Sequence, residues 1–160
     1  MRDLGDSSPL AFPLFTSSVY SLEDLDTQDA ISSGERHGFI YARDGHPNAQ
    51  RLSQQLSTLS GASSGVICSS GMSAISALML SLLRSGDRVV VSNLLYGRTT
   101  QLFLQELARF GVKASFVDSC NLSDVALSLQ QETKPRALFV ETLSNPLLRL
   151  AAISELANLA

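Results

Sequence analysis

The sequence predicts an α/β domain built around a parallel sheet. From about residue 47 onward, short runs of Val, Ile, Leu and Phe alternate with helical patterns of ten or more residues. Nearly continuous apolar strands separated by helices are typical of parallel sheets, which are buried on both faces. With 160 residues and 44% hydrophobic content, the chain can form one sizeable core but not two ordinary domains.

The N-terminal part differs in character from the rest of the chain. Residues 1–45 are rich in Ser, Asp and Gly and show little periodicity, so we expect an extended arm with one short helical turn near residues 21–31. The sheet domain is expected to occupy residues 46–160. Pro47 suits a first helical position and Gly61 a helix end, which predicts a helix between them.

Strands and helices then alternate, and Gly, Pro and polar capping residues separate them. The expected strands are residues 65–70, 88–92, 112–118 and 137–141. The expected helices are residues 72–86, 99–111 and 123–131, the last capped by Ser123, and one that starts within 151–160.

Composition excludes several classes of function. The net charge of −3, without a basic run, argues against a nucleic-acid partner and favours a small molecule or a protein. No apolar run is long enough to span a bilayer, and acidic residues and prolines interrupt the N-terminal stretch, so we expect a cytoplasmic protein without a membrane partner. Cys68 and Cys120 lack partner spacing and are expected to be buried, and His37 and His46 suggest no metal site.

In parallel α/β sheets, ligands bind beyond the carboxyl ends of the strands. The segment Ser69–Ser70–Gly71–Met72 follows the first expected strand and opens a helix. Free backbone N–H groups and the positive helix end would meet there, so a phosphate is a natural ligand. An ordinary helix cap with a tight turn is the alternative.

Three further side chains follow the second and fourth expected strands. Tyr96 can stack on a planar ligand and move a proton through its hydroxyl, or it can simply pack a loop onto the sheet. Glu141 and Asn145 offer a carboxylate and an amide that could bind polar ligand edges, although Asn-Pro is also an ordinary turn signal.

Tyr41 and Arg43 stand two residues apart in an irregular segment, where both side chains could point the same way. Together they could hold a phosphate with fixed hydrogen-bond directions. The alternative is a solvated arginine on the arm.

Four ordered motifs, GFIYARDGHPN, CSSGMSAI, LLYGRTTQLF and VETLSNPLLR, resemble the Cys/Met-metabolism family of pyridoxal-phosphate enzymes. This family includes cystathionine gamma-synthases and lyases, methionine gamma-lyases and homoserine sulfhydrylases. The resemblance runs from about residue 13 to the end of the sequence. It implies part of the large domain of the fold-type I, aspartate-aminotransferase-like fold, with helices on both faces of the sheet.

The resemblance also implies roles for individual residues. The backbone of Gly71 and Met72 would hold the phosphate of pyridoxal 5′-phosphate. Tyr96 resembles the catalytic ring that stacks on the pyridine and assists proton transfer. Asn145 would lie beside the phenolic oxygen of the cofactor, and Glu141 would lie near this site.

Tyr41 and Arg43 resemble a pair that reaches the phosphate site of a neighbouring subunit. The resemblance therefore implies a homo-oligomer built from dimers, with a tetramer expected, and an arm that contacts the neighbour. The substrate would be a small amino acid of the cysteine, methionine or homoserine type.

The family uses a lysine for the internal Schiff base, in a Ser-x-Thr-Lys setting. The two lysines here, Lys113 and Lys134, lack that setting. Lys113 opens the third expected strand and Lys134 comes before the fourth, so both are expected at the end of the sheet away from the proposed site. In the family, the anchoring lysine comes after the point where this sequence ends. We therefore expect a truncated, inactive N-terminal portion of a longer enzyme.

The family resemblance also predicts a gap in the sheet. On the pattern we expect, later strands insert between the strands encoded here, so that only residues 88–92 and 112–118 would be direct neighbours. Unpaired backbone groups would then remain along the other strands.

Three hypotheses for function follow. The leading one is a pyridoxal-phosphate carbon-sulfur lyase or gamma-replacement enzyme of transsulfuration. The second is a non-catalytic homologue that acts only through subunit association. The third is a phosphate-binding α/β module for another ligand.

Overall fold

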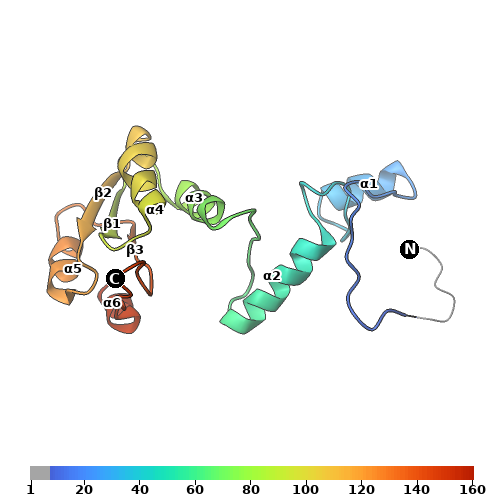
Figure 1. The fold of residues 1–160 in the computed structure, drawn as a ribbon. Coiled ribbons are helices and arrows are strands. Elements are labelled where there is room, and N and C mark those ends of the chain that lie inside the picture. The colour runs from blue at the N-terminus through green and yellow to red at the C-terminus, as the bar shows by residue number, and fades with distance from the viewer. Residues whose placement is uncertain (1–7) are drawn as a thin grey trace. The chain divides into compact units, whose positions relative to one another are not determined.

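The computed structural model describes residues 8–160 (Figure 1). The chain divides into two compact units, one ending at Ile67 and the other spanning Cys68–Ala160. The roles predicted for residues 1–45 and 46–160, a subunit-contacting arm and an incomplete cofactor-binding domain, stay predictions.

The first unit contains two helices. Helix α1 spans Leu25–Ser32, where a short helical turn is expected. Helix α2 spans Pro47–Ser60 and ends at Gly61, whose φ of 65° lies in the left-handed region that favours glycine. This confirms the helix predicted from Pro47 and Gly61.

The segment before α1 pairs with the segment after it. Val19 and Tyr41 form an antiparallel bridge, and the N–H of Ala42 donates to the carbonyl of Ser18 at 2.8 Å. The rings of Tyr20 and Phe39 lie 5.7 Å apart beside this bridge. The predicted arm is therefore folded back on itself rather than extended throughout.

A three-stranded parallel sheet organises the second unit. Its strands are β1 (Arg88–Ser92), β2 (Lys113–Val117) and β3 (Ala137–Phe139), in the order β2-β1-β3. The parallel sheet is confirmed, but the gap predicted between residues 88–92 and 137–141 is wrong. Strand β1 pairs with β3 as well as with β2, so its backbone is hydrogen-bonded on both sides.

The strand expected over residues 65–70 is not formed. Val66 is 86% exposed and Ile67 is 36% exposed, where burial was expected. A strand needs a neighbouring strand to satisfy its N–H and C=O groups. Within residues 8–160, the sheet of β1, β2 and β3 provides no such neighbour for this segment.

Four helical segments accompany the sheet: α3 (Gly71–Leu82), α4 (Gly97–Gln101) continued by the π-helix η1 (Leu102–Leu107), α5 (Leu122–Leu129) and α6 (Ile153–Leu159). Gly111 follows the π-helical segment with a φ of 83°, as its predicted helix-ending role requires. The N-cap of α5 is Asn121 and not the predicted Ser123. The Asn121 side chain accepts from the N–H groups of Ser123 and Asp124, so the helix begins one residue after Asn121.

Helices cover both faces of the sheet, as predicted. Val89 and Val91 face one cluster, which includes Met79 of α3 and Phe103 of η1. Val90 faces the opposite cluster, which draws its buried residues from β2, α5, the segment before α6 and α6: Val117, Val125, Ala151 and Leu156. In Figure 1, α3 and α4 lie to one side of the strands, while α5 and α6 lie to the other. All three valines of β1 are fully buried.

Candidate functional site

The loops that follow the three strands are tied together at the carboxyl edge of the sheet. The hydroxyls of Ser92, at the end of β1, and Ser119, after β2, are 2.8 Å apart and buried. The N–H of Tyr96 donates to Oε1 of Glu141, at 3.0 Å, which joins the loops after β1 and β3. Two of the predicted site residues, Tyr96 and Glu141, therefore meet at this edge.

Gly71 and Met72 form the first turn of α3. Ser70 and Ser73 make a capping box, in which the Ser73 N–H donates to the Ser70 Oγ at 3.1 Å and the Ser70 N–H donates to the Ser73 Oγ at 3.0 Å. This arrangement leaves the N–H groups of Gly71 and Met72 without an acceptor among residues 8–160. A Cβ added at Gly71 would meet nothing within 4 Å. The start of α3 therefore presents two open donors beside free space.

Tyr96 directly precedes α4, and α4 contacts the start of α3 through Thr99. Thr99, in the first turn of α4, is 1% exposed, and its hydroxyl donates to the sulfur of Met72 at 3.7 Å. The Tyr96 side chain itself is 52% exposed. The structure thus joins α4 to the first turn of α3 and leaves the Tyr96 ring accessible.

The loop that carries Asn145 is held in a tight fold. Leu143 and Leu150 form an antiparallel bridge, and the buried Ser144 accepts from the N–H of Arg149 at 3.0 Å. Asn145 is exposed, next to that buried serine. The cis peptide bond between Asn145 and Pro146 lies in the same loop.

An ion pair that the sequence analysis missed links this loop to the one after β2. Arg149 lies 3.3 Å from the carboxylate of Asp118, which also accepts the N–H of Cys120 at 2.9 Å. Asp118 at a strand end was a recognisable signal, whereas nothing local to Arg149 indicated its partner. Both cysteines are partly exposed, so the prediction that Cys68 and Cys120 are buried is wrong.

Tyr41 and Arg43 are brought together in the first unit. The guanidinium carbon of Arg43 lies 5.1 Å from the centre of the Tyr41 ring, a cation–π contact. Arg43 also lies 3.6 Å from the carboxylate of Asp44, and its side chain is 79% exposed. The pair therefore points the same way and is accessible.

The two lysines lie at the other edge of the sheet. Lys113 is the first residue of β2, paired in register with Arg88, and Lys134 precedes the start of β3. Parallel strands all begin at the same edge, so both lysines are at the opposite end of the strands from Tyr96 and Glu141. This confirms the placement predicted from the sequence.

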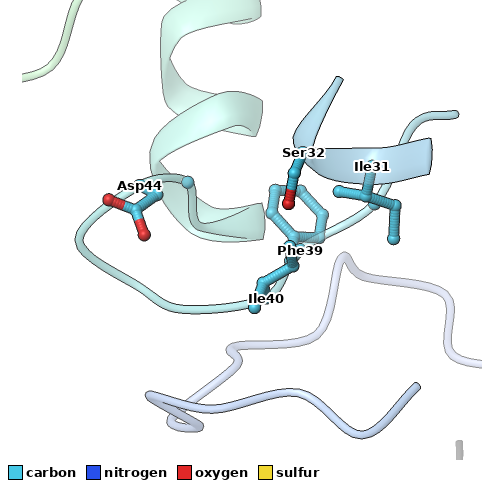
Figure 2. A pocket seen from close by; sticks show the side chains of 7 residues that line it. Ile31, Ser32, Phe39, Ile40 and Asp44 are labelled. Atoms are coloured by element: carbon cyan, nitrogen blue, oxygen red, sulfur yellow. The ribbon is translucent and has the colours of Figure 1, made fainter. Parts of the chain in front are cut away.

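The first unit also contains a pocket of about 410 Å³, which Figure 2 shows from close by. Ile31 and Ser32 from the end of α1 line it together with Phe39, Ile40 and Asp44 from the following segment. Asp44 is its one charged side chain. None of the predicted site residues lines it.

Residues 8–160 hold no group of three or more His, Cys, Asp or Glu side chains placed to bind a metal ion. In the same part of the chain, no helix combines the length and apolar character that crossing a bilayer requires.

The parallel sheet with helices on both faces, and the donors at its carboxyl edge, define an α/β protein with a candidate anion site. Residues 3–160 match the family described as Cys/Met metabolism PLP-dependent enzyme. The chain belongs to this family, whose members depend on pyridoxal phosphate.

Curated relatives have related names. The chain is 34% identical over 151 residues to an L-methionine gamma-lyase of Fusobacterium nucleatum, covering 94% of this chain and 38% of that protein. It is 40% identical over 149 residues to the O-succinylhomoserine sulfhydrylase of Pseudomonas aeruginosa, covering 92% of this chain and 36% of the relative. The chain thus spans little more than a third of the length of these relatives.

Solved structures agree with the family and identify the fold as fold-type I. A Campylobacter jejuni protein described as an O-acetylhomoserine (thiol)-lyase, with N'-pyridoxyl-lysine-5'-monophosphate, superposes with a TM-score of 0.83 at 32% identity. The match covers 94% of this chain and 37% of that one. Cystathionine gamma-lyase from Lactobacillus plantarum, complexed with L-serine, gives a TM-score of 0.78 at 29% identity, over 92% of this chain and 36% of that one.

Proposed function

We propose that this chain supplies the phosphate-binding and ring-contacting part of a pyridoxal-phosphate enzyme of sulfur amino-acid metabolism. The reaction is carbon-sulfur bond cleavage or gamma-replacement on an amino acid of the cysteine, methionine or homoserine type. Family membership and the names of the relatives support this class of reaction.

The observation that carries the proposal is the pair of open N–H donors on Gly71 and Met72. Residues elsewhere in the first turn of α3 satisfy their donors through the capping box, while these two remain available at the positive end of a helix. A phosphate group accepts several hydrogen bonds and carries negative charge, so it fits this set of donors. The open space at Gly71 allows the anion to approach the backbone closely.

Tyr96 and Asn145 would contact the ring of the cofactor, and Tyr96 is the catalytic residue. Its exposed ring offers a flat face for stacking, and its hydroxyl can hold or move a proton. When bound, the cofactor supplies an electron-accepting ring for chemistry at the substrate. The role proposed for Asn145 is to bind and orient the cofactor.

We further propose that neither lysine anchors the cofactor. Lys113 is the first residue of β2 and Lys134 precedes β3, so both lie at the amino edge of the sheet, whereas Tyr96 and Glu141 follow β1 and β3 at the carboxyl edge. These 160 residues would then bind the cofactor without a covalent bond and be inactive by themselves.

Tyr41 and Arg43 are proposed to reach the phosphate site of a second subunit. The guanidinium lies over the Tyr41 ring and its ion pair with Asp44 is exposed, so an anion from outside the unit can still reach it. The arm of residues 1–45 would then be a subunit contact within a homo-oligomer built from dimers. Residues 46–160 would be the incomplete cofactor-binding domain.

Substitution of Gly71 by proline tests the phosphate site. Gly71→Pro removes one donor at a first helical position, where proline is tolerated, and Ser70 is already extended (φ −158°, ψ 163°), as a residue before proline should be. A hydrogen bond to a charged group contributes about 1.5–3 kcal/mol, so affinity should fall roughly 10- to 100-fold. Calorimetric titration with pyridoxine 5′-phosphate measures this without aldehyde reactions at the lysines.

Gly71→Ala is the matched control, because alanine keeps the N–H group. It should lose clearly less affinity than Gly71→Pro, and pyridoxine without the phosphate should bind weakly to all three proteins. If Gly71→Pro and the unaltered chain bind pyridoxine 5′-phosphate with equal affinity, the N–H group of Gly71 does not bind the phosphate.

A second candidate function is subunit association without catalysis. The position of both lysines favours it, as does the exposed Tyr41–Arg43 pair. Sedimentation velocity of the chain with and without pyridoxine 5′-phosphate separates the two functions. Self-association without any binding of the vitamer would favour this candidate over the leading proposal.

A further inference from the structure

A long-range hydrogen bond fixes the backbone of Tyr96. Its N–H donates to Oε1 of Glu141, which is 45 residues away in the sequence, at 3.0 Å. Its carbonyl accepts from the N–H of Thr100, also at 3.0 Å. Both polar groups of the Tyr96 backbone are therefore engaged, one of them by a carboxylate.

Packing covers only about half of Tyr96, because the residue is 52% exposed. Tyr96 stands at the N-cap of α4, and its side chain makes no capping hydrogen bond. The place of the ring therefore depends on the backbone from which it projects.

Glu141 is suited to hold that backbone because it follows a strand of the sheet. Strand β3 ends two residues earlier at Phe139, which is paired in register with Val91 of β1. The carboxylate also brings negative charge to the start of α4, where the helix dipole favours it. A charge-assisted hydrogen bond of this kind is stronger than one to a neutral acceptor.

We propose that Glu141 is a positioning residue for Tyr96: its carboxylate holds the backbone of the loop so that the exposed ring stays where it can meet a planar ligand. This inference rests on the proposed function, because it assumes that Tyr96 contacts the cofactor ring. Glu141 itself acts through Tyr96 and not through the phosphate site.

A double-mutant cycle tests the proposal with the full 160-residue chain. Glu141→Ala should weaken pyridoxine 5′-phosphate binding about 3- to 10-fold, the loss expected from a misplaced aromatic contact. In a Tyr96→Leu background the same substitution should have little further effect. Inorganic phosphate should bind the unaltered chain and Glu141→Ala equally well.

Glu141→Gln is the conservative control, because its side-chain oxygen can still accept the Tyr96 N–H. It should restore most of the affinity lost in Glu141→Ala. An affinity loss in Glu141→Ala that persists undiminished in the Tyr96→Leu background would overturn the proposal, since Glu141 would then act without Tyr96.

The amide NMR signal of Tyr96 in the ligand-free chain provides a second, independent readout. Loss of the carboxylate acceptor in Glu141→Ala should move this signal upfield, while Glu141→Gln should move it less. Unchanged amide signals of Val89, Val90 and Val91 report that the sheet stays folded. A Tyr96 amide that does not respond to Glu141→Ala would overturn the positioning role.

Ligand binding and the Tyr96 amide signal distinguish failure of the proposed function from failure of the positioning role. If the unaltered chain binds no pyridoxine 5′-phosphate, the proposed function fails, and the Tyr96 amide alone decides whether Glu141 holds this loop. If the vitamer binds and the amide responds, the double-mutant cycle decides whether that hold affects the ligand.

Discussion

Arg88 shows how a single charged residue can organise the amino edge of a sheet. It is 6% exposed, and its guanidinium donates to the Ser115 hydroxyl, to the Thr133 carbonyl and to both the carbonyl and the hydroxyl of Ser128. No carboxylate pairs with it among the described residues. Backbone and hydroxyl oxygens alone therefore compensate the buried charge, and they connect β1 to β2 and α5.

We expect Arg88→Ala to lower the free energy of unfolding by about 3 kcal/mol. The substitution leaves several buried acceptors without a donor and removes the packing of the side chain. Urea unfolding followed by far-ultraviolet circular dichroism measures the change. Arg109→Ala is the control, because the Arg109 side chain is 77% exposed and, among residues 8–160, its ion pair is with Glu106, so its loss should change stability by less than about 0.5 kcal/mol. Equal effects of the two substitutions would contradict this account.

At the scale of the element, the hydrogen bond that caps the N-terminus of α1 depends on pH. The Asp24 carboxylate accepts from the N–H of Thr27 at 2.8 Å, and this bond, together with the Thr27 hydroxyl and the nearby Arg36, holds the pKa of Asp24 below its ordinary value of 3.8. A lowered pKa in the folded state means that the cap stabilises α1 above the unfolded pKa. That stabilisation is lost as the pH falls through the folded pKa.

We therefore expect α1 to weaken below about pH 4, with the Thr27 amide proton moving upfield and losing protection against exchange relative to its intrinsic rate at the same pH. Two-dimensional NMR across an acid titration follows this amide directly. Asp24→Asn keeps an acceptor but cannot titrate, so the response of the Thr27 amide to pH should be much smaller in that variant. An identical titration of Thr27 in both proteins would show that another group controls the cap.

At the scale of the whole molecule, the buried core belongs to one part of the chain. Both clusters of buried apolar residues, the one around Val89 and Phe103 and the one around Val90 and Leu156, come from Cys68–Ala160. No buried apolar residue of either cluster comes from the described part of the first unit. The sheet should therefore not need residues 1–67 to form.

We expect residues 68–160, produced alone, to keep the sheet and its helices. Hydrogen exchange of the Val89, Val90 and Val91 amides should be protected to within about tenfold of the level in the full chain, because their partners all remain. Loss of protection in the shorter chain would show that the first unit contributes to folding of the second.

Several features followed from the sequence by itself because they depend on local chemistry. Pro47, Gly61 and Gly111 mark helix boundaries through backbone preferences that need no distant partner. The apolar runs of β1 and β2 indicated buried parallel strands, and the order of motifs indicated the family. The donors at Gly71 also followed from local sequence, because a strand-like run passing into a helix predicts a helix N-terminus.

Only the tertiary structure decided which segments become neighbours. It placed β3 beside β1, left residues 65–70 without a strand partner, and brought Glu141 to the backbone of Tyr96. The physical reason is that strand pairing and long-range hydrogen bonds depend on which groups meet across the fold. Propensity and periodicity describe what a segment can form, whereas the available partners determine what it does form.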